Sequence, residues 1–194
     1  MISLDISLNE DQLRHVRDSL LHIPGAANRA IARAINRAVE GARTDTVKAI
    51  CTEYTIKPTD VRKAILIKRA KPNKLEAQII STGSPIPLFK FKVNPKSTRS
   101  KRRVVASVKF GSAVTLPPYM FIQKMGTGRV GVFSRKNNET NEISGRMPIT
   151  QKYAPSFPQM LGNEEVLKYV EMKAYYRLDK ELGHQVRYLF GGGR

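Results

Sequence analysis

The feature that most constrains this chain is a helical pattern of alanines between Pro24 and Ala49. Small apolar residues recur there at steps of three and four, which places them on one face of a long helix. These residues are Ala27, Ala30, Ile31, Ala34, Ile35, Ala38 and Ala42. Alanine buries little area per residue, so such a helix must pack closely along its whole length against another helix or a sheet.

The opposite face of this helix is polar and mostly basic, with Arg29, Arg33, Asn36, Arg37, Glu40 and Arg43. Two compatible interpretations follow. The segment is an ordinary amphipathic core helix, or it docks on a sheet and presents its basic face to a partner. We expect the helix to fray near Glu53.

Two shorter helices flank the long one. Ser7 and Glu10 form a capping-box pattern, which predicts a helix over residues 7–21. Downstream, Pro58 suits the first turn of a short helix. That helix would turn three apolar residues inward, namely Val61, Ala64 and Ile65.

From Leu66 onward the apolar pattern changes to a period of two, which is typical of half-buried strands. LFKFKV is the clearest example, because its apolar residues alternate with Lys90 and Lys92. Pro148 cannot donate to a ladder, so we expect its strand at a sheet edge. We predict five or six antiparallel strands, drawn from residues 66–70, 75–80, 88–93, 104–110, 119–125, 129–135 and 146–152.

A second long helix closes the chain after an irregular stretch at residues 153–158. Asn163 is its expected N-cap. Its apolar stripe comprises Val166, Leu167, Val170, Ala174, Leu178, Leu182, Val186 and Leu189.

The order of helices, strands and helix predicts an α+β fold in a single domain over residues 1–194. Its expected parts are an N-terminal helix in 1–23, the long and short helices in 24–65, a central antiparallel sheet in 66–152 with a basic loop at 94–103, a C-terminal helix in 153–190, and a mobile tail at 191–194.

Charge is the strongest compositional signal. The chain has 34 lysines and arginines against 16 acidic residues, a net charge of +18. Between Arg62 and Lys109 there are fourteen basic residues and a single carboxylate, Glu76, which gives this segment a net charge of +13. Such a surface attracts polyanions, of which nucleic acid is the usual one, or it meets an acidic protein partner.

Known enzyme motifs are missing. Gly126, Gly128 and Gly131 match G-x-G-x-x-G, but the residues that follow alternate like a strand instead of opening the helix that a dinucleotide site needs. These glycines therefore predict a hairpin turn. The three histidines, His15, His22 and His184, lie far apart along the chain, and no histidine or cysteine pair has metal-ligand spacing.

Other features of the sequence also argue against a catalytic site. The middle of the chain offers only Glu76 for acid–base work. The single cysteine, Cys51, cannot form an internal disulfide and is expected to be a small buried residue. With no secretion signal and no apolar run of about 20 residues, we expect synthesis in the host cytoplasm and no membrane partner. We expect no enzyme, no catalytic residue, no cofactor and no metal ion.

The candidate site is the basic loop, which suits non-specific contact with phosphates. Its cations are Lys96, Arg99, Lys101, Arg102 and Arg103, and the secondary candidates are Lys68, Arg69, Lys71 and Lys74. Four aromatic residues, Phe89, Phe91, Tyr119 and Phe121, alternate on the predicted strands, where they pack in the core or stack on bases. A helix-turn-helix over residues 49–68 is disfavoured by Pro58 and by the strand pattern that follows.

Six segments span about residues 24–189: PGAANRAIARAINRA, VRKAI, LFKFKV, the basic loop, PPYMFIQKMGTGRVGVFSR and LDKELGHQVRYL. In this order the chain resembles the minor tail protein Z family of lambda-like long-tailed bacteriophages. None of the segments is a catalytic motif, so the likeness is one of pattern and order.

The resemblance implies a tail-completion protein, a structural virion subunit at the head-proximal end of the tail. It implies a homo-hexameric ring that contacts the tail terminator, the tail tube and the head connector and helps to position the genome end. Basic loops lining such a ring would contact genomic DNA or the end of the tape-measure protein.

A free non-specific nucleic-acid-binding protein is the alternative function. It predicts salt-dependent binding by the isolated chain, with a slope set by the number of phosphates neutralised. A tail subunit instead gains order when it joins other tail parts.

Overall fold

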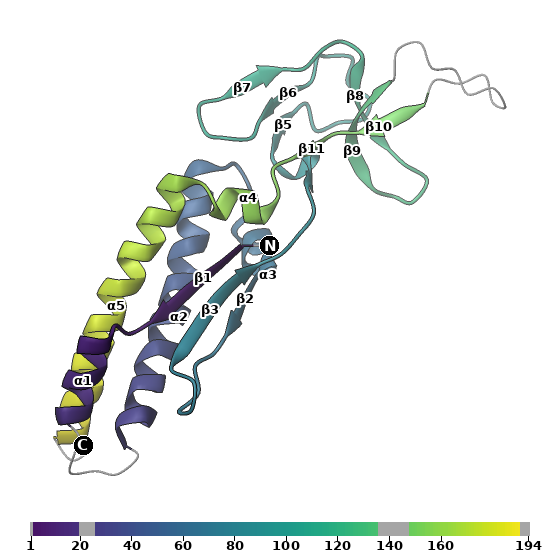
Figure 1. The fold of residues 1–194 in the computed structure, drawn as a ribbon. Helices are drawn as coiled ribbons and strands as arrows, with labels where there is room; N and C mark the ends of the chain where they lie inside the picture. The colour runs from purple at the N-terminus through teal and green to yellow at the C-terminus, as the bar shows by residue number, and fades with distance from the viewer. Residues whose placement is uncertain (1, 20–25, 136–147, 191–194) are drawn as a thin grey trace.

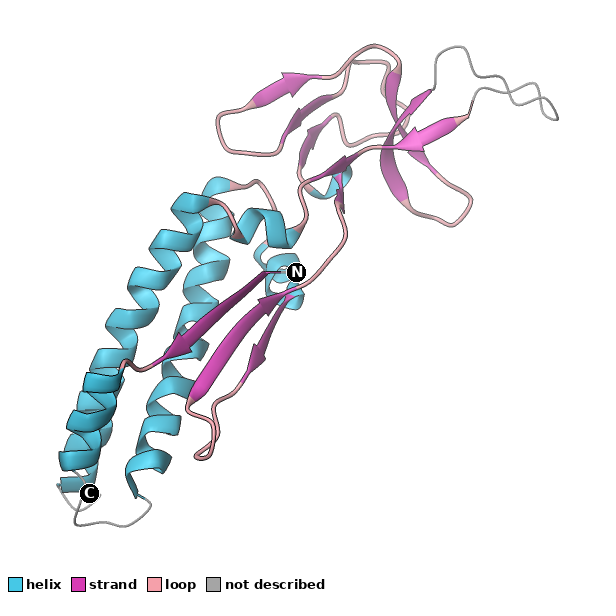
Figure 2. Ribbon diagram, viewed as in Figure 1, coloured by secondary structure: helices cyan, strands magenta, loops and turns pink. Residues whose placement is uncertain are grey.

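The computed structural model describes residues 2–19, 26–135 and 148–190, which form two parts stacked end to end (Figure 1). We call the described residues within 2–81 and 157–190 the helical part, and residues 86–135 and 148–154 the β part. Figure 2 shows helices concentrated in the first part and short strands in the second. The polar loop predicted at 136–145, His22, the start of the strand at 146–152 and the tail at 191–194 fall wholly or partly outside the described residues.

Two long antiparallel helices, α2 (Ala26–Glu53) and α5 (Glu164–Phe190), run the length of the helical part (Figure 1). The predicted alanine stripe of α2 is confirmed, since its residues from Ala30 to Ala42 are buried and Ala27 is half-buried. The predicted stripe of α5 also lies in the core or packs against it. Asn163 caps α5 as predicted, because its Oδ1 accepts a hydrogen bond from the backbone N–H of Glu165 at 3.1 Å.

A three-stranded antiparallel sheet packs against the helix pair. Its order is β1 (Ile2–Ser7), β3 (Glu76–Ser81) and β2 (Ile65–Lys68). Leu4 of β1 pairs with Ile79 of β3, and both are buried. Helix α2 therefore contacts α5 and this sheet at once. The fully buried Val39 widens its apolar face beyond the alanine stripe.

The N-terminus corrects the prediction of one helix over residues 7–21. Residues 2–7 form strand β1, and α1 (Glu10–Ser19) begins later. The capping box lies at Asn9 and Gln12 instead of Ser7 and Glu10: the Asn9 side chain accepts from the Gln12 N–H at 2.8 Å, and the Gln12 side chain accepts from the Asn9 N–H at 3.3 Å. The segment ISLDIS alternates apolar and polar residues, so pairing with β3 buries one of its faces.

The short helix α3 (Pro58–Ala64) forms as predicted, with Val61 fully buried and Ile65 buried directly after it. The stretch 153–158 is more regular than predicted. Its first two residues form β11 (Tyr153–Ala154), and Ser156 caps helix α4 (Phe157–Leu161) through a capping box with Gln159.

The β part contains three small antiparallel sheets. One has the order β5 (Lys92–Asn94), β6 (Val105–Ser107), β7 (Ala113–Thr115), and a second has the order β10 (Ile149–Gln151), β9 (Val130–Arg135), β8 (Met120–Lys124). Strand β4 (Ile86–Pro87) pairs with β11. The α+β class is confirmed, but the strands of the described residues form four small sheets instead of one central sheet.

Two strand predictions differ from the structure in detail. Residues 88–90 of LFKFKV form a 3-10 turn, η1 (Leu88–Lys90), which is closed by the Phe91 N–H donating to the Leu88 carbonyl at 3.1 Å. Within the predicted strand 104–110, Val105–Ser107 form β6, Lys109 forms an isolated bridge with Tyr54, and Phe110 is 61% exposed. The Ser107 hydroxyl donates to the Lys109 carbonyl at 2.7 Å, which turns the chain before Phe110.

The glycine-rich segment is a hairpin turn, as predicted. Strands β8 and β9 pair on either side of it, with Phe121 opposite Phe133. Gly128 has a φ of +79°, a conformation that favours glycine. These glycines therefore form a hairpin turn, and they do not let the backbone approach a phosphate as the glycines of a dinucleotide site do.

Candidate nucleic-acid interface

Positive charge is concentrated in the β part. Its described residues include twelve lysines and arginines and no carboxylate. They are Lys90, Lys92, Lys96, Arg99, Lys101, Arg102, Arg103, Lys109, Lys124, Arg129, Arg135 and Lys152. One of these cations, Lys90, lies 3.9 Å from Asp60 of α3. A surface of one sign attracts polyanions over distances of about a Debye length.

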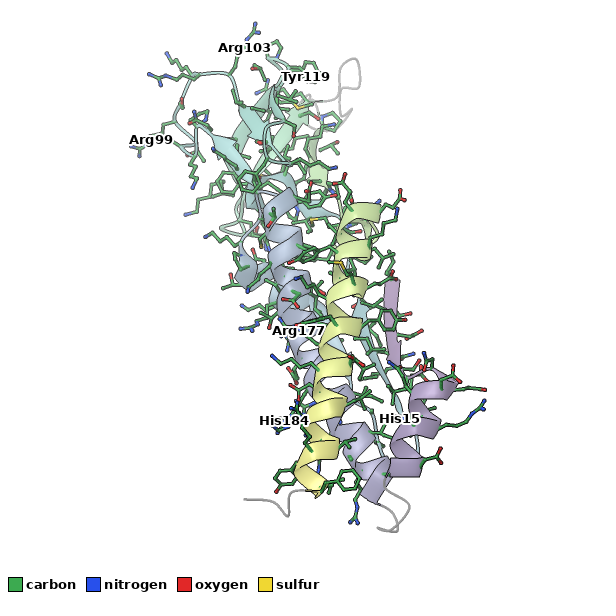
Figure 3. All side chains as sticks on the ribbon, turned by 90° about the vertical axis from the view of Figure 1, so that its left-hand side faces the viewer. His15, Arg99, Arg103, Tyr119, Arg177 and His184 are labelled. Carbon is green, nitrogen blue, oxygen red and sulfur yellow. The ribbon has the colours of Figure 1, made fainter. Side chains whose placement is uncertain are left out.

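The predicted basic loop joins β5 to β6 at the far end of the β part (Figure 3). Its five candidate cations, Lys96, Arg99, Lys101, Arg102 and Arg103, are all exposed. Two serine turns shape its backbone, because Ser97 Oγ accepts from the Arg99 N–H at 3.2 Å and Ser100 Oγ accepts from the Arg102 N–H at 3.3 Å. Buried Val104 anchors its end.

A groove of about 550 Å³ separates the loop from strand β8. Lys101, Arg102 and Arg103 line one side, and Met120 and Phe121 line the other. Among the residues that the structure describes, no carboxylate lines it. The groove therefore combines cations for phosphates with an apolar wall, the pairing that single-stranded or splayed nucleic acid uses.

The four aromatic candidates separate into different roles. Phe91 is buried in the core and Phe89 is half-buried against it. Phe121 is half-buried in the groove wall, with its ring centroid 6.4 Å from that of Phe133. Tyr119 is exposed and lies at the same end of the molecule as Arg103 (Figure 3).

One contact in this region is not evident from the sequence. The guanidinium carbon of Arg135 lies 5.5 Å from the ring centroid of Phe121, a cation–π distance. Arg135 thereby adds a cation beside the groove wall, contributed by β9. Its position beside Phe121 depends on the β8–β9 register, which spacing along the chain does not reveal.

The secondary basic candidates lie elsewhere. Lys68 ends β2, and Lys71 and Lys74 flank the turn between β2 and β3, in the helical part (Figure 1). Arg69 Nη2 lies 2.6 Å from Glu40 Oε1, and Lys74 Nζ lies 3.3 Å from Glu76 Oε2. The structure therefore does not bring the two basic clusters together, and carboxylates neutralise part of the second one.

The described histidines, which the sequence does not mark as metal ligands, lie away from the basic loop. His15 lies on α1 and His184 on α5, both at the end of the molecule far from the basic loop (Figure 3). Within the described ranges no group of three or more histidine, cysteine or acidic side chains could hold a metal ion. Partial burial raises the pKa of the Cys51 thiol, so little reactive thiolate forms there at neutral pH. None of the helices that the structure describes is both long and apolar enough to cross a membrane.

Comparison with known proteins identifies a family for this chain. The family model described as prophage minor tail protein Z (GPZ) matches residues 18–190. No curated protein and no solved structure shows significant similarity to the chain. The matched region includes all the described elements except β1 and most of α1, of which only Asp18 and Ser19 are matched.

Proposed function

The chain belongs to the prophage minor tail protein Z family, and on that premise we propose that it is the head-proximal completion subunit of the tail. Its family is one of structural phage tail proteins, so the chain is a tail component of a virion. In this proposal it joins the tail to the head connector and contacts the tail terminator and the tail tube. Several copies, six in the simplest case, form a ring around the DNA channel.

The observation that carries the proposal is the separation of charge between the two parts. The described β part holds twelve cations without a carboxylate, and its loop cations are exposed at one extremity of the molecule. The helical part carries residues of both charges. In a ring with the β part facing inward, the loops of all copies would surround the genome end.

The groove beside the loop supports contact with DNA more than contact with an acidic protein. Its cations follow one another at Lys101, Arg102 and Arg103, a spacing that suits successive phosphates. Phe121 in the groove wall and Arg135 over its ring together offer an apolar and cationic surface beside which a base at a strand end can lie. These contacts carry no sequence preference, as expected for a part that meets one genome end.

The test is imaging of particles that carry Lys101, Arg102 and Arg103 all changed to alanine. We expect tails to join heads while the genome end fails to enter the tail. A matched control removes the same charge at Lys68, Lys71 and Lys74, which lie in the helical part. The control should behave as wild type.

Three other results would change the assignment. Normal genome placement in the loop variant would remove the DNA contact. If imaging finds the protein at the end of the tail far from the head, the proposed head-proximal location is wrong. Particles that lack the protein, together with salt-dependent DNA binding by the isolated chain, would favour the free nucleic-acid-binding protein.

A further inference from the structure

The outward face of α5 carries large apolar and aromatic side chains. Tyr169, Met172, Tyr175 and Tyr176 are between 41% and 68% exposed. Their spacing places them on one side of the helix, opposite the buried stripe. We call these four residues the tyrosine ridge. Tyrosine and methionine are enriched in protein interfaces, whereas a helix face that meets only water normally carries charged residues.

Exposed carboxylates flank the ridge. Glu165 and Asp179 lie seven residues before and after Met172, which is two helical turns in each direction along the same face. Figure 3 looks onto α5, which runs along the front of the helical part, with the labelled Arg177 midway. Cations also border the ridge, because Lys173 Nζ lies 5.7 Å from the ring centroid of Tyr169 and Lys168 pairs with Glu164 at 2.6 Å. The ridge is therefore an apolar surface with Glu165 and Asp179 at its two ends.

The β part offers a surface with the opposite properties. A groove of about 360 Å³ lies on one face of the β5–β6–β7 sheet. Val105, Ala113 and the exposed Phe110 supply its apolar lining, Thr55, Asn94 and Ser107 supply polar groups, and Lys92 supplies a cation. None of the described residues that line it is a carboxylate. Its volume suits one or two large side chains. Strand β7 is an edge strand with all three residues exposed, so nothing in the described chain covers this side of the sheet.

We propose that the tyrosine ridge of one copy docks into the β5–β7 groove of a second copy. The convex ridge fits the concave groove at its apolar residues Val105, Phe110 and Ala113. The carboxylates of Glu165 and Asp179 meet a basic surface that includes Lys92 and has no carboxylate among its described residues. Because the two surfaces differ, each added copy leaves one ridge and one groove free. Such head-to-tail contacts close into a ring or extend as a filament. The inference rests on the proposed function in one respect: several copies of the chain assemble in the tail.

Cysteine cross-linking tests the contact in the full chain. In a Cys51→Ser background, one variant carries Met172→Cys and another carries Ala113→Cys, both at exposed positions. Under mild oxidation the mixture should give a disulfide heterodimer at least tenfold faster than either variant gives homodimers. A chain that carries both substitutions should give a ladder of multimers, in concentrated solution or in assembled tails. The matched control replaces Ala113→Cys by Thr127→Cys, which is exposed in the β8–β9 turn outside the groove, and it should give no ladder.

Two outcomes would overturn the proposal. Dominant homodimers of the Met172→Cys variant would mean that two α5 helices pack against each other. No heterodimer and no ladder, in solution or in tails, would mean that the ridge binds another partner. The ladder should persist when Lys101, Arg102 and Arg103 are also changed to alanine. The self-association and the DNA contact can therefore fail separately.

Discussion

Arg177 and Asp45, 132 residues apart in the sequence, form a two-pronged ion pair that connects α5 to α2. Arg177 Nε donates to Asp45 Oδ2 at 2.8 Å, and Nη2 donates to Oδ1 at 3.1 Å. The Asp45 side chain is only 6% exposed, whereas the Arg177 side chain is 43% exposed. The hydrogen bond to Asp45 raises the pKa of Arg177, which partial burial alone would lower. The pair thus keeps a buried carboxylate satisfied between the two longest helices.

Arg177→Ala should destabilise the protein because it leaves the Asp45 carboxylate buried without its partner. We expect a loss of about 2 kcal/mol in the free energy of unfolding, less than the 3–5 kcal/mol of a fully buried pair because Arg177 is partly in water. Arg37→Ala is the matched control, since Arg37 Nη1 meets Glu181 Oε2 at 3.4 Å in an exposed pair between the same helices. It should cost less than about 1 kcal/mol. Urea unfolding measures both, and equal losses would contradict this role of the pair.

Gly41 gives the arginine its space. A Cβ added to Gly41 would lie 2.6 Å from Arg177 Cδ and 3.0 Å from Nε. Gly41→Ala should therefore displace Arg177 from Asp45 and lower stability, although alanine in a helix is normally better than glycine by about 1 kcal/mol. In an Arg177→Ala background the sign should reverse, and Gly41→Ala should stabilise. A double-mutant cycle by thermal or urea unfolding measures this coupling, and simple additivity of the two changes would exclude it.

The sequence predicts the helices better than the contacts between them. The alanine stripe of α2 and the stripe of α5 follow from spacing alone, because a helix places every third or fourth residue on one face. The pairing of Asp45 with Arg177 depends on how α5 packs against α2, which no local pattern encodes. From the sequence alone Asp45 is expected to be exposed, because aspartate is charged. It is buried because Arg177, far away in the sequence, neutralises its carboxylate.

Ala38 is fully buried on α2. Ala38→Leu inserts three extra carbons where the helix meets its neighbours, and we expect a loss of about 1–3 kcal/mol from overpacking. Arg33→Leu adds an apolar side chain to the exposed face of the same helix and should change stability by less than about 0.5 kcal/mol. Thermal unfolding compares the two variants. A neutral Ala38→Leu would mean that the contact between the helices is looser than its burial indicates.

The thiol of Cys51 should react slowly in the folded protein. Partial burial raises its pKa, so less thiolate is present at a given pH than in the unfolded chain. A raised pKa also means that the folded state holds this proton more tightly. The resulting stabilisation is complete below the unfolded pKa and is lost as the pH rises through the folded value, on the alkaline side. Alkylation rates at pH 8, with and without urea, check this, and equal rates would contradict it.

The strands show where local patterns are insufficient. LFKFKV alternates like a strand, but its buried residues Leu88, Phe91 and Val93 are spaced by three and then two, and a tight turn satisfies that spacing. The residues of β7 are all exposed, so no alternation marks them. In the candidate site, the loop cations follow from composition alone. The groove wall and the cation–π contact of Arg135 with Phe121 require the pairing of β8 with β9.

Salt dependence of DNA binding isolates the contribution of the basic loop. If Lys101, Arg102 and Arg103 each neutralise one phosphate, changing all three to alanine should reduce the slope of log K against log salt by about 2 to 3, since each contact contributes about 0.9. The control variant at Lys68, Lys71 and Lys74 should reduce it less, because Lys74 already pairs with Glu76 and the cluster lies in the other part of the molecule. Fluorescence anisotropy with a short duplex at several salt concentrations gives both slopes. Equal reductions in the two variants would show that net charge, and not the loop and its groove, governs the binding.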